Sequence, residues 1–276
     1  MPKERKLRRE EIEAFRAQIW AFYSACGRHD LPWRVTKDPY KILVSEVMLQ
    51  QTQVARVEEK FPKFLWKFPT VGELAKAPLK EVLAVWAGMG YNRRALALKR
   101  CAEKIVAEHR GKVPRGRDEL EALPGIGPYT AGAIRAFAFD EPEVFIETNI
   151  RRVFIHQFFG NQEGIGDKEI LPLVEATLDR GQPREWYWAL MDYGAELPKV
   201  VRKNPNVQSR HYVKQSTFKG SLREVRGKIV RVLSEGSGTL VAIRRACEGD
   251  ARTKEALDAL TKDGLVYYEK RKYQLA

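Results

Sequence analysis

One carboxyl group in this sequence lies in a setting that suits proton transfer. Glu46 falls within a mostly apolar run, residues 40–49, which Pro39 opens. Ile42 and Leu49 stand four residues before it and three residues after it, so a helix would place the three side chains on one face. Desolvation there would raise the pKa of the carboxyl toward the working pH of a general acid. A solvated surface glutamate is the commoner alternative, so the wider sequence context has to decide.

The segment Leu-Pro-Gly-Ile-Gly-Pro at 123–128 has the residue types of a phosphate-binding turn. Gly125 and Gly127 allow the backbone to turn sharply and to approach a phosphate, and a helix beginning at Pro128 would present its first N–H groups there. Such a hairpin could hold a DNA strand without reading its sequence. A plain turn between two helices has the same residues, and the segment alone leaves both interpretations open.

The charge balance favours an anionic partner. The chain of 276 residues has 49 Lys and Arg against 36 Asp and Glu, a net charge of +13. Residues 199–231 hold ten Lys and Arg against one acid, Glu224. Phosphate, an acidic protein and an anionic membrane all fit this excess, and a solvated linker is the simplest interpretation of the basic segment.

Several classes of protein are disfavoured. No run of 18 apolar residues predicts a membrane span, and the charged first residues do not resemble a secretory signal, so we expect no membrane partner. Single cysteines at 26, 101 and 247 show no paired spacing and indicate a reducing compartment without disulfides. We expect a cytoplasmic protein, nucleoid-associated if the source is prokaryotic.

Apolar spacing predicts a mostly α protein. Apolar residues recur at steps of three and four residues from residue 9 to about 106, which predicts a series of short helices. Helices are also expected on both sides of the hairpin, and a further helical stretch ends near 195. The composition changes at 203–206, which marks a linker. Three amphipathic runs (223–233, 239–246 and 253–260) then precede a strand pair at 265–269 and 273–275, the order of a winged helix-turn-helix domain.

Five segments together resemble the helix-hairpin-helix DNA glycosylases, specifically the MutY-like adenine glycosylases. They are Leu-Pro-Trp-Arg at 31–34, Ser-Glu-Val-Met-Leu-Gln-Gln-Thr at 45–52, Gly-Met-Gly-Tyr at 88–91, the hairpin at 123–128, and Met-Asp-Tyr-Gly-Ala at 191–195. The resemblance covers about residues 9–200. It implies a two-lobed helical glycosylase core at 1–203, with a six-helix barrel at about 35–140 and a second lobe from 1–34 and 141–203. A basic linker at 204–221 and a winged-helix domain at 222–276 would follow.

The resemblance assigns catalytic roles. Glu46 matches the general acid that protonates the purine ring. Glu147 stands where the family has an aspartate that faces the anomeric carbon, and its extra methylene would shift the carboxylate by roughly 1.5 Å, a misplacement that can cost about 10²-fold in rate. Retained activity, an altered substrate and an inactive site are the three possible outcomes. Tyr129 and Asn149 match positions that orient this carboxylate.

The resemblance also predicts contacts with DNA. Gln51 and Tyr91 match residues that enter the base stack when a nucleotide is extruded, and Arg93 and Arg94 would hold phosphates beside them. The other predicted DNA contacts in this part of the chain are Thr52, Gly125, Gly127 and Thr130. Independently of the resemblance, the basic residues Lys270 and Arg271 at the tip of the expected wing suit a phosphate or the minor groove. The base pocket would be lined by Trp33, Arg34 and Leu49.

Cofactors and partners follow from the same comparison. Iron-bearing members have four cysteines after Gly-Ala, whereas this sequence has Glu-Leu-Pro-Lys at 196–199, so we expect no [4Fe–4S] cluster and no required cofactor or metal. A monovalent cation on the hairpin carbonyls stays open. Bifunctional relatives have a lysine at the position of Tyr129, so we expect a monofunctional enzyme. The expected partner is double-stranded DNA with a lesion or mismatch, bound by a monomer.

The substrate is less well determined than the reaction. Adenine opposite guanine or 8-oxoguanine is the first expectation. About 55 residues follow the linker, too few for the Nudix-like domain that inspects 8-oxoguanine in many relatives, which keeps a T/G or U/G mismatch glycosylase as the alternative. A catalytically inactive DNA-binding protein is the rival from another class.

Overall fold

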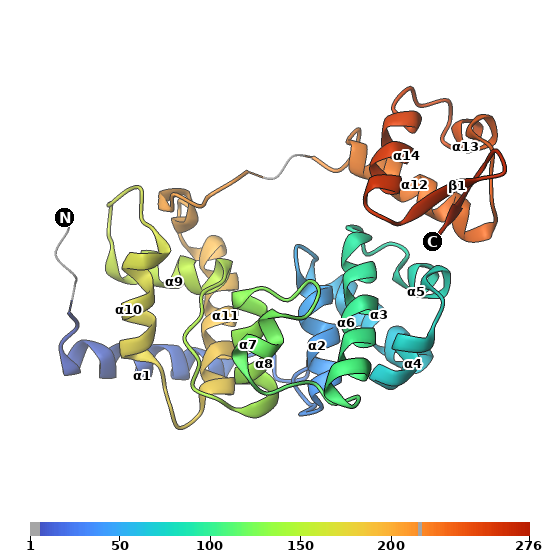
Figure 1. Cartoon of the computed structure of the whole chain (residues 1–276). Coiled ribbons are helices and arrows are strands. Elements are labelled where there is room, and N and C mark those ends of the chain that lie inside the picture. Colours follow the sequence, from blue (N-terminus) through green and yellow to red (C-terminus); the bar gives the residue numbers. More distant parts are fainter. Residues whose placement is uncertain (1–5, 215–216) are drawn as a thin grey trace. The chain divides into compact units, whose positions relative to one another are not determined.

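The structure, a computed structural model, describes residues 6–214 and 217–276 (Figure 1). In this part of the chain there are fourteen α-helices and one two-stranded sheet, which confirms the mostly α fold. The chain divides into two compact units. The first unit comprises Met1–Ile42 and Ile126–Lys214, and the second comprises Leu43–Gly125 and Gln215–Ala276.

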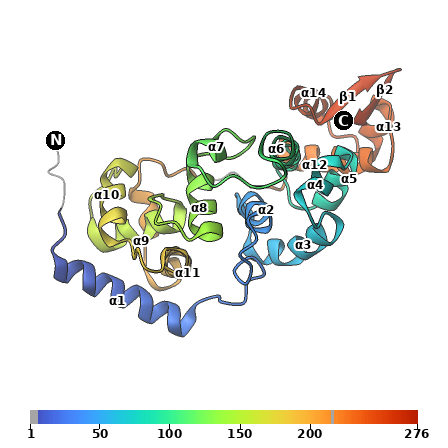
Figure 2. The ribbon, with the colours of Figure 1, turned by 60° about the horizontal axis from the view of Figure 1, so that its bottom comes forward.

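The first unit is a bundle of five helices and one 3-10 turn (Figure 2). Its elements are α1 (Arg9–Cys26), α8 (Pro128–Phe139), α9 (Thr148–Phe158), α10 (Asp167–Thr177), α11 (Pro183–Val200) and η1 (Pro205–Gln208). The core of this bundle is aromatic. Phe15 of α1 lies edge-on to Phe154, Phe158 and Trp186, with ring centroids 5.1 to 6.0 Å apart. Each such pair contributes about 0.5–1.5 kcal/mol beyond its buried area, so α9 and α11 are held firmly against α1.

Helix α9 and helix α11 pack at very short range. A Cβ atom at Gly194 of α11 would lie 2.4 Å from the backbone oxygen of Asn149 on α9. Only a residue without a side chain permits this approach. The glycine of the Met-Asp-Tyr-Gly-Ala segment therefore has a structural role, which is to bring α11 against the first turn of α9.

The second unit contains the remaining helices. Helix α2 (Pro39–Leu49) begins in the first unit and enters this one, where it is followed by α3 (Val54–Lys67), α4 (Val71–Lys76), α5 (Leu79–Trp86), α6 (Arg93–His109) and α7 (Arg117–Glu121). Phe64, Phe68 and Trp86 are buried between α3 and α5, with ring centroids 5.0 and 6.1 Å from Phe64. Thr70 begins α4 with a capping box: its Oγ1 accepts the Glu73 N–H at 3.2 Å.

The C-terminal part of the second unit has the expected element order. Helices α12 (Leu222–Glu235), α13 (Leu240–Ala246) and α14 (Thr253–Lys262) precede the antiparallel strands β1 (Val266–Glu269) and β2 (Lys272–Leu275). Gly238 adds a further bridge to Tyr273, with N–O distances of 2.9 and 2.8 Å in the two directions. The assignment of this segment to the winged-helix class stays a prediction.

The boundaries of the two compact units differ from those of the lobes expected from the sequence. Helix α8 belongs to the first unit rather than to a barrel at 35–140, because Phe137 stacks on Trp188 of α11 at 5.7 Å and its carbonyl accepts a hydrogen bond from Arg184 at 2.6 Å. The expected linker at 204–221 is partly structured. Asn206 donates to the Thr148 carbonyl at 2.9 Å, which fastens η1 to α9. Residues 215–216 of that linker and residues 1–5 lie outside the described residues.

Candidate active site

Glu46 lies in the C-terminal half of α2, a helix that the protein buries. Pro39 begins the helix, where a missing N–H costs nothing, and the Asp38 carboxylate accepts the Tyr40 N–H at 2.9 Å. The side chain of Glu46 is 4% exposed, and Ile42, one turn earlier, is 1% exposed. The burial that the spacing predicts for this carboxyl is therefore present.

Glu147 caps the N-terminus of α9. Its Oε1 accepts the backbone N–H of Asn149 at 2.7 Å and that of Ile150 at 2.8 Å. Aspartate, asparagine, serine and threonine are the usual residues at this position because their oxygens reach the same N–H groups with a shorter side chain. Here the longer side chain folds back onto its own helix. The extra methylene is thereby accommodated without removing the carboxylate from the helix end.

The charge on Glu147 is subject to opposing influences. Burial raises the pKa of this carboxyl, while the N–H groups of Asn149 and Ile150, followed by the charges of Arg152 and Arg151, lower it. Burial is the larger effect, so the pKa ends above its ordinary value of 4.5. The helix end and the arginines favour the charged form, and the site holds a carboxylate that is easier to protonate than one in water.

Asn149 connects this carboxylate to Arg152. Its Nδ2 donates to Glu147 Oε2 at 3.2 Å, and its Oδ1 accepts from Arg152 Nη1 at 2.9 Å. The same Nη1 donates to the Gly194 carbonyl at 2.5 Å, and Arg152 Nε donates to Asn204 Oδ1 at 3.2 Å. Because the guanidinium only donates, the oxygen of the Asn149 amide must face Arg152 and its nitrogen must face Glu147.

Arg152 contacts the side chain that holds Glu147, and the sequence patterns did not reveal this neighbour. It stands three residues after Asn149 and five after Glu147, so a helix beginning near 148 would place its side chain over the same face as Asn149. That spacing was the available signal. An arginine on a helix is more often solvated, so this spacing alone did not identify Arg152 as a neighbour of the carboxylate.

Tyr129 lies in the first turn of α8 and is half-buried. Its ring meets Phe145 edge-on at 5.8 Å, and Phe145 in turn stacks on Tyr187 at 3.9 Å. These contacts fix the position of the Tyr129 ring, and its predicted action on the carboxylate stays a prediction. Thr130 was expected at the DNA surface, but its side chain is 3% exposed. Its hydroxyl is therefore not presented to a phosphate, while a contact through the backbone of this first helical turn stays a prediction.

The two glycines of the hairpin differ in what they do. Gly125 has a positive φ of +79°, and a Cβ there would lie 2.8 Å from the Cβ of Ala97, so the turn itself requires glycine. Gly127 has extended backbone and begins α8 as its N-cap. A Cβ at Gly127 would project into open space. The fold itself therefore does not require glycine at 127, and the predicted approach of a phosphate to this residue stays a prediction.

Gln51 and Tyr91 share an uncommon backbone conformation. Their φ angles are 52° and 45°, in the left-handed region that costs a non-glycine residue about 1–2 kcal/mol. Both side chains lie at the surface. Strain of this kind clusters at functional sites, which supports the predicted entry of these residues into the base stack. The Tyr91 hydroxyl hydrogen bonds to Arg223 of α12 at 2.5 Å.

The three polar neighbours of these residues were all predicted to contact DNA. Arg93 is exposed, with its Nη1 3.6 Å from Asp263, and remains a candidate for a phosphate contact. Arg94 faces inward and donates to backbone carbonyls and to Thr52 Oγ1. The predicted phosphate contact of Arg94 is corrected accordingly, since its donors are engaged inside the protein. Thr52 is half-buried beside it.

Arg34 was predicted to line the base pocket, and the structure gives it another role. Its side chain is 4% exposed and forms two hydrogen bonds with Asp192, of 2.7 and 2.9 Å. Burial raises the pKa of Asp192, but Arg34 and Arg28 outweigh it and hold that pKa below its ordinary value. The prediction for Arg34 is corrected, because its charge is used by a buried carboxylate. Trp33 is buried, and Leu49 is half-buried at the end of α2.

Lys270 and Arg271 form the two-residue turn between β1 and β2. The flanking residues Glu269 and Lys272 pair directly, and the turn residues have φ angles of 49° and 63°. Positive φ at both positions is what a type I′ hairpin turn requires, and Asn-Gly is the usual sequence. Two long basic residues therefore occupy positions where the backbone disfavours them, and both project from the tip.

The predicted site residues fall into two groups, one in each unit. Glu147, Asn149, Tyr129, Trp33 and Arg34 belong to the first unit, while the second unit holds Glu46, Leu49, Gln51, Tyr91 and Arg93. Each group contains one of the two carboxyl groups.

The next feature is the set of side chains that could bind a metal ion, together with the three cysteines. Across residues 6–214 and 217–276, no group of three or more His, Cys, Asp and Glu side chains could hold a metal ion. Cys101 and Cys247 are buried, which raises the pKa of both thiols, that of Cys101 to about 12. Cys26 is exposed. Buried thiols of this kind are inert.

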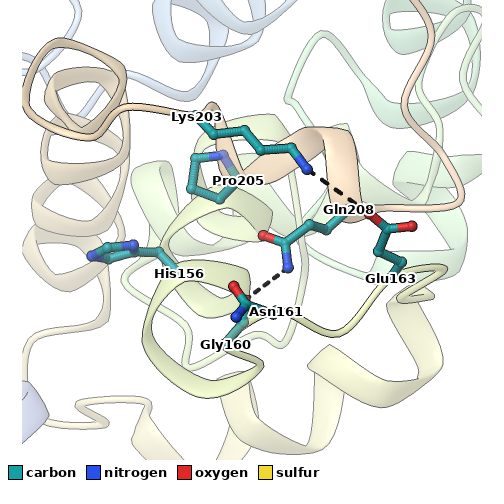
Figure 3. Close-up of a pocket in the computed structure, with 7 residues that line it drawn as sticks. All are labelled: His156, Gly160, Asn161, Glu163, Lys203, Pro205 and Gln208. Carbon is teal, nitrogen blue, oxygen red and sulfur yellow. Dashed lines mark hydrogen bonds and ion pairs between the residues drawn. The ribbon is translucent and has the colours of Figure 1, made fainter.

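A polar pocket of about 360 Å³ in the first unit lies apart from these residues (Figure 3). Lys203 and Glu163 face each other across it at 3.8 Å, and Gln208 donates to the Gly160 carbonyl at 2.8 Å. None of the predicted site residues is among those that line it, which are His156, Gly160, Asn161, Glu163, Lys203, Pro205 and Gln208.

Known proteins resemble this chain over most of its length. An adenine DNA glycosylase from Mycolicibacterium smegmatis is 34% identical over 260 residues, 87% of this chain and 88% of that protein. One from Buchnera aphidicola is 36% identical over 195 residues, 69% of this chain, which spans 54% of that relative. The solved structure of a thermostable thymine-DNA glycosylase has a TM-score of 0.60 at 30% identity, covering 67% of this chain and 87% of that one.

The helical fold, the hairpin at 123–128 and the buried carboxyl of Glu46 together place this chain in the class of helix-hairpin-helix DNA repair proteins. The family model of the HhH-GPD superfamily base excision DNA repair protein matches residues 44–181. The chain belongs to this superfamily, and its relatives make it a DNA N-glycosylase. The resemblance to the adenine glycosylases is thus confirmed. Among the helices that the structure describes, none is both long and apolar enough to cross a membrane.

Proposed function

We propose that this glycosylase hydrolyses the N-glycosidic bond of adenine opposite guanine or 8-oxoguanine in double-stranded DNA. It would act without cutting the strand. The adenine DNA glycosylases of Mycolicibacterium smegmatis and Buchnera aphidicola support the choice of base, since they match this chain at 34% and 36% identity. The observation that carries the chemistry is the Glu147 carboxylate, held by two backbone N–H groups at the start of α9.

Glu46 acts as the general acid in this proposal. Its burial removes water from the carboxyl group, and a neutral acid can donate its proton to a ring nitrogen of the extruded purine. Protonation makes the base a better leaving group, so the bond between that base and the deoxyribose carbon breaks with both electrons going to the base.

Glu147 stabilises the positive charge that develops on the sugar as this bond stretches. Its hydrogen bonds to Asn149 and Ile150 engage three of the roughly four lone-pair sites of a carboxylate, two at Oε1 and one at Oε2. Oε2 therefore has capacity to face the sugar. Water then adds to the anomeric carbon and loses a proton, which leaves free adenine and an abasic site.

Tyr129 supports the monofunctional outcome. Strand cleavage by bifunctional relatives needs an amine that forms a Schiff base with the sugar. A phenol at this position provides no such nucleophile, so hydrolysis ends at the abasic site. We extend the proposal to an enzyme that works without a [4Fe–4S] cluster, since the chain has three cysteines and the cluster is held by four,.

The test uses single-lesion duplexes and two variants. Wild type, Glu46→Gln and the control Glu58→Gln, an exposed glutamate on α3, are incubated with A·G, A·8-oxoG, T·G and U·G duplexes. Release of adenine by wild type and by Glu58→Gln, with loss in Glu46→Gln, is the expected result. Alkali-dependent strand breakage would identify the product as an abasic site.

Two other outcomes would replace the proposal. Release of thymine or uracil alone would assign the chain to the activity named for the thermostable thymine-DNA glycosylase, which it resembles at 30% identity. Binding of all four duplexes without any base release would make the chain an inactive DNA-binding protein. In that case Glu46→Gln would leave the measured behaviour unchanged.

A further inference from the structure

Arg94 connects two loops of the second unit through its guanidinium group. Nη1 donates to the carbonyls of Val47 and Met48 at 2.8 and 2.9 Å, at the C-terminal end of α2. Nη2 donates to Thr52 Oγ1 at 2.9 Å and to the Met89 carbonyl at 3.2 Å. One planar group therefore fastens the segment after α2 to the segment before α6.

These acceptors lie close in sequence to Gln51 and Tyr91, the two surface residues with left-handed backbone described above. Gln51 lies between Met48 and Thr52, and Tyr91 follows Met89 by two residues and has a φ of 45°. The carbonyls at the end of a helix lack partners within that helix, so a fixed donor there determines the path of the chain beyond it. Arg94 supplies that donor for one loop and reaches the other loop at the same time.

The aromatic rings around Arg94 fix its guanidinium group from the side. Its Cζ lies 5.3 Å from the Trp86 ring and 5.5 Å from the Tyr91 ring. The Trp86 Nε1 donates to the Gly90 carbonyl at 3.0 Å, which anchors the same loop independently. Burial lowers the pKa of Arg94 to about 10, so the group stays charged at neutral pH.

We propose that Arg94 is a positioning residue that sets the backbone of Gln51 and Tyr91 so that both side chains can enter the base stack together. This inference rests on the proposed function, in which a nucleotide leaves the duplex. Lysine could not replace arginine here, because a compact ammonium group cannot span carbonyls from two loops with a fixed geometry. Arg94 acts through its neighbours and does not itself touch DNA.

The first measurement follows base extrusion. Duplexes with 2-aminopurine at the adenine position are mixed with wild type, Arg94→Met, Arg94→Lys and the control Arg100→Met, an exposed residue of the same helix. The fluorescence rise that marks unstacking should slow by about 10²-fold in Arg94→Met, the penalty that a 1 Å misplacement can cause. Arg94→Lys should recover only part of this loss, and Arg100→Met should behave as wild type.

The second measurement separates positioning from phosphate binding. If Arg94 bound a phosphate, Arg94→Met would lower the slope of log Kd against log salt by about 1 and weaken binding of undamaged duplex. The proposal expects an unchanged slope in Arg94→Met. A reduced slope, with extrusion affected only in proportion to affinity, would overturn it.

A double-mutant cycle tests whether Arg94 acts through Tyr91. Tyr91→Ala and Arg94→Met should each slow extrusion, and the double variant should be little slower than the slower single variant. If the double variant slowed extrusion by the product of the two single-variant factors, the two residues would act independently and the proposal would be overturned. Thermal unfolding of every variant accompanies the cycle, and Arg94→Lys serves as the test variant if Arg94→Met does not fold.

Failure of the proposed function is distinguishable from failure of this inference. If wild type extrudes 2-aminopurine but releases no base from any duplex, the proposed reaction fails while the extrusion data still test Arg94. If wild type releases adenine and Arg94→Met extrudes and releases it at the wild-type rate, the reaction stands and the positioning role is wrong.

Discussion

Arg152 Nη1 lies 2.9 Å from Asn149 Oδ1 and thereby determines which end of that amide faces Glu147. Without this donor, only the 3.2 Å hydrogen bond from Asn149 Nδ2 to Glu147 Oε2 would orient the amide, and the amide would be held less firmly. The arginine also donates to the Gly194 carbonyl, so the orientation of one amide depends on the packing of α9 against α11.

Arg152→Met should therefore reduce the rate of base release with little change in the affinity for DNA. Removing a group that orients an active-site ligand typically costs about 10–100-fold. Single-turnover rates and binding titrations, measured side by side, separate the two effects. Arg180→Met is the matched control, since Arg180 is an exposed arginine of the same unit, with its Nη2 3.8 Å from Glu175. Equal losses in both variants would contradict the role given to the amide.

Gly194 and Gly227 should respond to alanine with opposite signs. A methyl group at Gly194 meets the Asn149 oxygen at 2.4 Å, and overpacking of this kind costs about 1–3 kcal/mol of unfolding free energy. Gly227 lies within α12 with no atom in the space of the new methyl group, so alanine there should stabilise the protein by about 0.5–1 kcal/mol. Urea unfolding measures both, and stabilisation by Gly194→Ala would show that α9 and α11 are further apart.

Local patterns predicted helices well and the direction of charged side chains poorly. The spacing around Glu46 predicted a buried carboxyl on a helix, and both are present. Arg94 at the start of α6 and Arg34 in a loop both had the sequence setting of groups that bind DNA, yet both donate to acceptors inside the protein. The acceptor of Arg34 is Asp192, 158 residues further along the chain. No local spacing contains such a partner, so only the fold shows where these charges are used.

The raised pKa of Glu147 makes a signed prediction about stability. The fold binds the carboxyl proton more tightly than the unfolded chain does, where the group titrates near 4.5. Stability from the protonated form is complete below that pH and is lost as the pH rises through the raised pKa. Glu147→Gln resembles the neutral form, so its unfolding free energy minus that of wild type should grow over this interval and then level off. Urea unfolding from about pH 4 to about pH 8 checks the sign, and a difference that shrinks with rising pH would refute it.

Lys270 and Arg271 should lower the stability of the turn that they form while they contribute to DNA binding. Replacing the pair with Asn-Gly, by Lys270→Asn and Arg271→Gly, puts a residue that tolerates left-handed backbone at 270 and a glycine at 271, and the glycine alone relieves about 1–2 kcal/mol. The double variant should therefore unfold at higher urea concentration than wild type. If both side chains neutralise phosphates, the slope of log Kd against log salt should also fall by about 2. Greater stability with an unchanged slope would assign the two residues to the surface rather than to DNA, whereas lower stability would contradict the left-handed geometry of the turn.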